Sequence, residues 1–216
     1  YAIMLSTVTG GVDLSAQINT INSIFGKVVN SYKFGVPLNY EKNPLYGKKI
    51  GVLGDSFAYG HTLGTDKVWL AKIASRNNMT AYNYGINGNC IAGSGGMAER
   101  YTFMINDLDY VVVIGGHNDA NQNIPIGTNS DSTIETYKGA LNVLINGLIT
   151  KYPLARILFL TPFNRYGNEK AYADAMIEMC GLYSIPCFNC YTSSGVNFYN
   201  DAQRAYYDLK VNGSYT

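Results

Sequence analysis

Short apolar runs alternate with amphipathic segments along most of the chain, from about residue 48 onward. Residues 110–114 are one tyrosine followed by four aliphatic residues, which is typical of a strand buried on both faces of a sheet. Residues 132–152 instead place apolar side chains three and four positions apart, as a helix with one buried side does. We predict strands at residues 49–53, 80–84, 110–114, 156–160 and 186–191. The predicted helices cover residues 66–77, 97–104, 132–152 and 169–183, and a last one begins near Asn200.

Apolar strands that alternate with helices predict an α/β fold with a parallel sheet covered on both sides. Right-handed crossover connections then give a three-layer α/β/α sandwich with a central, parallel, five-stranded sheet. In sheets of this kind, ligands bind outside the carboxyl ends of the strands. The loops that follow the predicted strands are therefore the places to look for chemistry.

The first 46 residues follow a different pattern. In residues 12–32 the apolar positions are separated by gaps of four, three, four, three and four residues, which is a heptad seam. We expect a helix that packs on the domain behind it or, alternatively, joins copies of the chain into a homotrimer through residues 14–32. Residues 1–46 are thus predicted to be an N-terminal segment that ends in a linker, and residues 47–216 the main domain. The seam consists of Leu14, Ile18, Ile21, Phe25, Val28 and Tyr32.

Composition and charge narrow the classes of function. Charged residues make up 14% of the chain and its net charge is +1, so no basic surplus is present to bind nucleic acid. The apolar runs are too short for a membrane span, and the N-terminus lacks the order of a signal peptide. The first residue is Tyr1, so we expect the chain to be part of a longer protein.

Tyrosine and glycine are abundant, with 19 and 23 residues. Tyrosine and asparagine offer flat rings and amide groups without net charge, which suits the binding of neutral sugars. Secreted and viral proteins often have such a composition, so an extracellular or virion-associated location is expected. Compositional drift in an AT-rich genome is the alternative explanation.

The cysteines do not predict a metal or redox site. Cys187 and Cys190 have a suitable spacing, but on a strand at residues 186–191 they would point to opposite faces. No second pair of metal ligands accompanies them, so we predict buried free thiols and neither a metal nor another cofactor. A disulfide that involves Cys180 stays open if the protein works outside a cell.

Three loops carry residues suited to acyl transfer, and each follows one of the first three predicted strands. Ser56 lies at a strand-to-helix turn, where a nucleophile can reach a carbonyl carbon. The N–H groups of Ser56 and Gly88 and the side-chain amide of Asn118 can form an oxyanion hole. The alternatives are that Ser56 caps a helix and that Asn118-Asp119 is an ordinary turn. The loops read Gly54-Asp55-Ser56, Gly85-Ile86-Asn87-Gly88-Asn89 and Gly115-Gly116-His117-Asn118-Asp119.

In these motifs the chain resembles the SGNH, or GDSL-type, hydrolases from about residue 48 to the end. Gly54-Asp55-Ser56 is similar to the first family block, Gly88 to the second-block glycine, and Gly116-x-Asn118-Asp119 to the third block. The resemblance implies a flavodoxin-like sandwich, Ser56 as nucleophile, and hydrolysis of acetyl esters on glycans or of lipid acyl esters. Asp55 and Asp119 are expected to brace the loops. Candidates for contact with substrate at the rim are Tyr59, Asn87, Asn89, His117, Asn164, Arg165 and Tyr166.

The family's Asp-x-x-His block, which supplies the base, is missing. The chain has two histidines, His61 and His117, and neither has an aspartate three residues before it. Three explanations stay open: the base lies beyond Thr216, the domain has lost its base and only binds, or one of the two histidines substitutes. Without its base, Ser56 would be a weak nucleophile, so the chain alone is expected to have little activity.

The sequence therefore predicts a carboxylic ester hydrolase that removes acetyl or other acyl groups from a carbohydrate through an acyl-Ser56 intermediate. Its expected partner is an ester-bearing small molecule or an acetylated glycan. The alternative is a catalytically inactive glycan-binding or structural module of a phage tail or cell-surface fibre.

Overall fold

The computed structural model describes residues 43–60, 67–195, 197, 199, 200 and 202, together with the backbone of 210–211 and 214–215. The chain divides after Pro44 into two units, and the described secondary structure lies in the second, Leu45–Thr216. The predicted helix at residues 12–32 and the residue His61 lie outside the described residues, so the seam and its trimer stay predictions.

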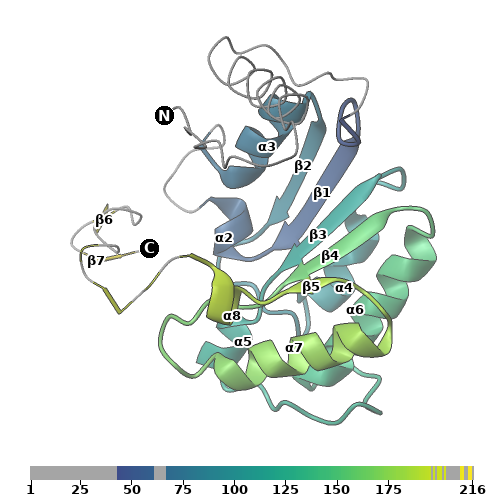
Figure 1. Ribbon diagram of the computed structural model, residues 1–216. Helices are drawn as coiled ribbons and strands as arrows, with labels where there is room; N and C mark the ends of the chain where they lie inside the picture. The colour runs from purple at the N-terminus through teal and green to yellow at the C-terminus, as the bar shows by residue number, and fades with distance from the viewer. Residues whose placement is uncertain are drawn as a thin grey trace, which may run out of the picture. The chain divides into compact units, whose positions relative to one another are not determined.

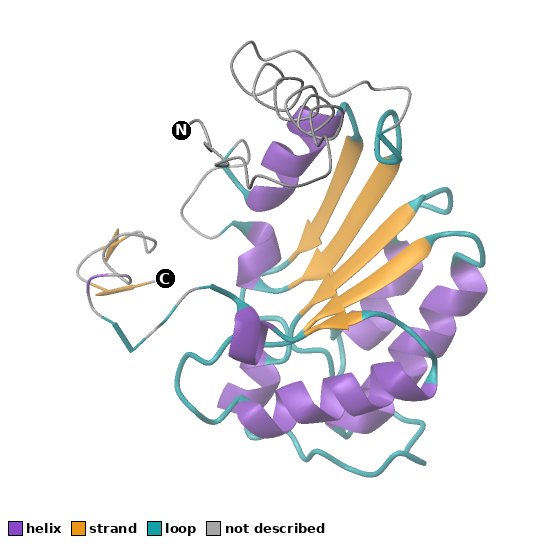
Figure 2. Cartoon of the chain, viewed as in Figure 1, coloured by secondary structure: helices purple, strands orange, loops and turns teal. Residues whose placement is uncertain are grey.

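A five-stranded parallel sheet forms the centre of the described domain, as predicted (Figures 1 and 2). The strands lie in the order β2-β1-β3-β4-β5, so the chain crosses back over β1 between β2 and β3. The switch point of the topology therefore lies between β1 and β3, where parallel sheets place their ligand sites. The strands are β1 (Lys49–Gly54), β2 (Thr80–Gly85), β3 (Tyr110–Ile114), β4 (Arg156–Leu160) and β5 (Cys187–Phe188).

Helices cover both faces of the sheet. Val111 and Val113 of β3 belong to one buried cluster, which also contains residues of α4, α6 and α7. Val112 and Ile114 belong to a second cluster, with residues of α2 and α3. Because successive strand residues point to opposite faces, the two clusters lie on the two sides of the sheet and make three layers. The helices named here are α2 (Ser56–Tyr59), α3 (Trp69–Asn77), α4 (Met97–Arg100), α6 (Tyr137–Lys151) and α7 (Lys170–Leu182).

Shorter elements complete the domain. The 3-10 helix η2 spans Tyr101–Phe103, α5 spans His117–Asn121 and α8 spans Cys190–Ser193. A separate antiparallel pair consists of β6 (Lys210–Val211) and β7 (Ser214–Tyr215). None of the helices in the described part of the chain combines the length and the hydropathy needed to cross a bilayer.

Two predicted helices have different boundaries, for local reasons. The helix predicted at 132–152 begins only at Tyr137, because the Thr136 side chain accepts a hydrogen bond from Gly139 N at 3.2 Å and caps it. The helix predicted at 97–104 ends at Arg100 and continues as η2. For α6 a short-range hydrogen bond from a capping side chain sets the boundary, and the hydrophobic spacing does not report it.

The prediction of a strand at residues 186–191 is wrong in length, because β5 spans only Cys187–Phe188. It ends at Phe188, and Asn189 caps α8 by accepting a hydrogen bond from Thr192 N at 3.2 Å. Cys190 therefore begins a helix, so the two cysteines do not share a strand. The Cys187 thiol instead forms a hydrogen bond with that of Cys180, which lowers the pKa of Cys187, and all four cysteines are free.

Candidate active site

The three predicted site loops leave neighbouring strands at one edge of the sheet. Gly54, near the end of β1, pairs with Gly85 of β2 and with Ile114 of β3. The pairing continues one residue further, because Ile86 N donates to Gly54 O at 3.0 Å. The strand arrowheads in Figure 2 all point to this edge, so the loops that carry Ser56, Gly88 and Asn118 start side by side.

Ser56 is the first residue of α2, and Asp55 caps that helix. The Asp55 carboxylate accepts a hydrogen bond from Phe57 N at 2.9 Å. The alternative in which Ser56 itself is the cap is therefore wrong, and Ser56 is half-buried with a hydroxyl group that does not cap the helix. Among the described residues, neither this hydroxyl nor the Ser56 N–H has a hydrogen-bond partner.

Neighbouring elements hold the turn at Ser56 in place. Asn83 Nδ2 of β2 donates to Ala58 O at 2.7 Å, and Trp69 Nε1 of α3 donates to Phe57 O at 3.0 Å. Gly85 of β2 lies so close to α2 that an added Cβ would be 2.7 Å from Ala58 C. The position of Ser56 thus depends on both β2 and α3.

The loop after β2 is fixed at Asn89 and open at Gly88. Gly88 has φ +74°, and a Cβ there would meet no atom within 4 Å. Asn89 O accepts from Asn118 Nδ2 at 3.0 Å. The Asn89 side chain accepts from Arg100 at 2.6 Å and donates to Gly95 O at 2.9 Å. Asn89, predicted at the rim, therefore braces this loop, while the Gly88 backbone faces open space.

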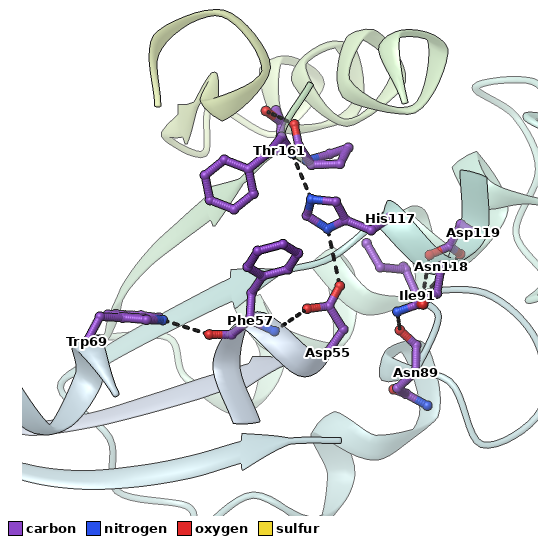
Figure 3. Close-up of polar contacts among 11 residues, drawn as sticks. Asp55, Phe57, Trp69, Asn89, Ile91, His117, Asn118, Asp119 and Thr161 are labelled. Atoms are coloured by element: carbon purple, nitrogen blue, oxygen red, sulfur yellow. Dashed lines mark hydrogen bonds and ion pairs between the residues drawn. The ribbon is translucent and has the colours of Figure 1, made fainter. Parts of the chain in front are cut away.

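Asp119 joins the second and third loops. Its carboxylate is fully buried and accepts hydrogen bonds from Ile91 N at 2.9 Å and from Ala92 N at 3.0 Å. Burial raises the pKa of Asp119 to about 6, although these hydrogen bonds oppose the shift. Asp119 and Asn118 thus attach the loop that contains Gly88 to the start of α5 (Figure 3).

His117 is buried, which agrees with a structural role and not with the alternative place at the rim. Its side chain lies at the start of α5 with 5% of the residue exposed. Nδ1 lies 3.3 Å from Asp55 Oδ2, and Nε2 accepts a hydrogen bond from Phe163 N at 2.8 Å (Figure 3). Both ring nitrogens are therefore engaged, so His117 does not offer Ser56 a free base. The other candidate, His61, lies outside the described residues.

Exposed aromatic side chains lie among the residues predicted to form the rim, with Tyr59 at the end of α2 and Tyr166 on the loop after β4. Tyr59 is 52% exposed and Tyr166 is 61% exposed, with the Arg165 guanidinium 4.8 Å from the Tyr166 ring centre. Asn164 Oδ1 accepts from the hydroxyl of Tyr199 at 3.0 Å. Asn87 is also exposed. Tyr199 was not predicted, because no strand end or family block lies beside it in the sequence.

The same domain matches known proteins by sequence and by structure. The sequence profile of the GDSL-like Lipase/Acylhydrolase family matches residues 52–210. A crystal structure of a Lactobacillus plantarum protein is similar, with 28% identity, a TM-score of 0.70, and coverage of 76% of this chain and 86% of that one. A search of curated protein sequences finds no match.

Two more distant structures share the fold. A protein described as a GDSL-like lipase from Bacteroides uniformis is 20% identical, with a TM-score of 0.59 and coverage of 66% of this chain and 83% of that one. AlinE4, an SGNH-hydrolase family esterase, is 15% identical, with a TM-score of 0.54 and coverage of 68% and 78%.

Proposed function

The chain belongs to the GDSL-like lipase/acylhydrolase family, and from this premise we propose that it is a serine ester hydrolase with Ser56 as its nucleophile. The observation that carries the proposal is the edge of the sheet where Ser56, Gly88 and Asn118 leave three adjacent strands. Ser56 is half-buried, and its hydroxyl forms no hydrogen bond within the described part of the chain, so it is available to react.

The proposed reaction has two steps. Ser56 Oγ attacks the ester carbonyl carbon and gives its proton to a base, and the tetrahedral intermediate expels the alcohol, which takes that proton. Water then hydrolyses the acyl-Ser56 ester by the same route. The oxyanion would accept hydrogen bonds from Ser56 N–H, Gly88 N–H and the Asn118 amide. In support, neither N–H donates to another described residue, and Asn118 Nδ2 has a second hydrogen besides the one that Asn89 O accepts.

The base is the component that the described residues do not supply, since both nitrogens of His117 are engaged. We propose that an Asp-x-x-His segment beyond Thr216 supplies it. The chain alone is then expected to hydrolyse esters slowly, and the full product of its gene much faster. Equal activity of the two forms would contradict a downstream base.

The test of the hydrolase proposal is Ser56→Ala in the full gene product. We expect the unaltered protein to release p-nitrophenol from p-nitrophenyl acetate, and the variant to do so no faster than buffer. Acid quenching during turnover should leave an acetyl group on the peptide that contains Ser56. Release that is unchanged in the variant would contradict the proposal.

A carbohydrate ester is the substrate class we propose. The rings of Tyr59, at the end of α2, and of Tyr166 and Tyr199 are exposed, and Asn164, which accepts a hydrogen bond from Tyr199, adds an amide. Rings of this kind stack on the apolar faces of sugars, and their hydroxyl groups offer hydrogen bonds. The low charge of the chain agrees with a neutral ligand.

Tyr166→Ala tests this substrate class. We expect it to raise KM for acetylated xylo-oligosaccharides about tenfold, the effect of losing about 1.4 kcal/mol of binding, and to leave kcat/KM for p-nitrophenyl acetate unchanged. The control is Phe103→Ala, which removes a ring that is 82% exposed on the segment before the amino end of β3. Equal effects of the two variants would argue against stacking on a sugar.

A second candidate function is a glycan-binding module without catalysis, which the engaged His117 favours. It fits a phage-tail or cell-surface fibre, outside the cell, if residues 14–32 join three chains. Under this candidate the full gene product would not hydrolyse p-nitrophenyl acetate, would bind glycans, and would sediment as a trimer. Ser56-dependent hydrolysis would exclude it.

A further inference from the structure

His117 connects three segments that are distant in sequence. It lies at the start of α5, its Nδ1 faces Asp55 in the turn before α2, and its Nε2 accepts from Phe163 N in the loop after β4. Its ring centre is 4.5 Å from that of Phe57 and 5.5 Å from that of Phe163. Figure 3 shows the His117 imidazole with a dashed line from Nδ1 to Asp55. The site loops of β1, β3 and β4 therefore meet at this one side chain.

These contacts fix the protonation of the ring. Nε2 accepts a hydrogen bond from a backbone N–H, so it carries no proton. Nδ1 then carries the single proton of the neutral imidazole and donates it to the Asp55 carboxylate. Asp55 is fully buried, with one oxygen bonded to Phe57 N and the other facing His117. A buried carboxylate is costly unless it is hydrogen-bonded, so the Asp55 turn depends on this donor.

We propose that His117 is a positioning residue for the nucleophile: as the neutral Nδ1–H tautomer it holds the Asp55–Ser56 turn against the β3 and β4 loops. The proposal rests on the proposed function, since it assigns a role in the reaction of Ser56. Asn118 directly follows His117 in the sequence. The contact between His117 and Asp55, which orients the turn at Ser56, therefore also fixes the segment that carries the Asn118 amide. Being buried, His117 is not expected to touch substrate.

Two amide variants separate the two contacts. In His117→Asn the side-chain N–H₂ replaces Nδ1–H toward Asp55, and the acceptor for Phe163 N is lost. In His117→Gln the amide oxygen reaches the place of Nε2 and accepts from Phe163 N, and the donor to Asp55 is lost. Losing the donor to a buried charge costs more than losing the acceptor for a neutral N–H. We therefore expect His117→Asn to resemble the unaltered protein more closely than His117→Gln does.

The kinetic test uses p-nitrophenyl acetate and the full gene product, per mole of folded protein. His117→Gln should lower kcat by 10- to 100-fold and His117→Asn by less than about fivefold, with KM unchanged in both. A purely structural role would leave kcat per folded molecule unchanged in both variants and would overturn the proposal. A larger loss in His117→Asn than in His117→Gln would also overturn it.

Nuclear magnetic resonance gives a readout that does not depend on activity. At neutral pH the ¹⁵N–¹H correlations of the His117 ring should show a proton on Nδ1 and none on Nε2. The backbone amide signals of Ser56 and Phe57 should shift in His117→Gln and stay near their original positions in His117→Asn. The opposite tautomer, or unmoved signals in both variants, would overturn the proposal. If these spectra agree but Ser56 catalyses nothing, the proposed hydrolase function has failed and with it the positioning role in that reaction, while the link to Asp55 is retained.

Discussion

Gly85→Ala is expected to abolish ester hydrolysis by the full gene product and to lower its free energy of unfolding by about 3 kcal/mol, the upper end of the usual cost of overpacking. A Cβ at this position would lie 2.7 Å from both Ala58 C and Tyr59 Cα, and closest to Tyr59 N. All three are backbone atoms of α2, so no side chain can move aside. The helix that begins with Ser56 must therefore shift away from β2.

Urea unfolding and p-nitrophenyl acetate hydrolysis measure the two effects. Gly181→Ala is the matched control, since it makes the same chemical change at an exposed position of α7 where a Cβ would meet no atom within 4 Å. The control should keep full activity and gain up to about 1 kcal/mol of stability, because alanine is the better helix former. A Gly85→Ala protein that is as stable and as active as the control would contradict the close packing of α2 on β2.

The parts of the fold that follow from burial could be predicted, whereas those set by single side chains could not. β3 and β4 have the bounds predicted for them. β3 is an apolar run that helices bury on both faces, and β4 has four consecutive apolar residues, of which Phe159 is buried and the others are half-buried. The start of α6 and the end of β5 differ from prediction, because Thr136 caps the amino end of α6 and Asn189 caps the amino end of α8, directly after β5. A capping side chain sets the boundary of an element through a local hydrogen bond, and the spacing of hydrophobic residues carries no information about that bond.

The candidate site, like the fold, has features that the sequence predicts and features that it does not. The sequence predicts that the loops of Ser56, Gly88 and Asn118 lie at one edge, because each follows a strand of a parallel sheet, and the structure adds that the three strands are neighbours. The link through His117 joins positions far apart along the chain, and no short motif reports such a contact. The third family block does not specify the residue at position 117, so the sequence left a structural role and a place at the rim as alternatives for His117, and only the packing of its ring shows that it is buried.

Asp119→Ala is the second variant with a large expected effect. It removes the acceptor of two N–H groups, those of Ile91 and Ala92, in residues that are themselves buried. Each buried donor left unpaired costs about 1–3 kcal/mol, so at pH 4, where the Asp119 side chain is uncharged in the folded protein, we expect a loss of about 3 kcal/mol in the free energy of unfolding. Hydrolysis of p-nitrophenyl acetate should fall at least tenfold, because the same loop carries Gly88. Unchanged stability would show that other contacts hold this loop.

Stability as a function of pH tests the electrostatics of Asp119. Burial raises its pKa from 3.8 to about 6 in the folded protein, so between these values the folded state binds the proton more tightly than the unfolded state does. The contribution of Asp119 to stability is therefore full below about pH 4, falls as pH rises toward 6, and is constant above it. A shift of about two pKa units corresponds to a fall of roughly 3 kcal/mol.

The asparagine in Asp119→Asn cannot ionise. The variant should therefore lack the fall in the free energy of unfolding that Asp119 causes between about pH 4 and pH 6. Urea unfolding at pH 4, 5, 6 and 7 gives the difference in free energy of unfolding between the unaltered protein and the variant. Relative to the variant, the unaltered protein should lose about 3 kcal/mol of unfolding free energy between pH 4 and pH 7. The other titratable groups contribute equally to both proteins and cancel in the difference. Parallel pH profiles would mean that Asp119 is as easily ionised in the folded protein as in water. The hydrogen bonds from Ile91 and Ala92 would then fully offset the cost of burial.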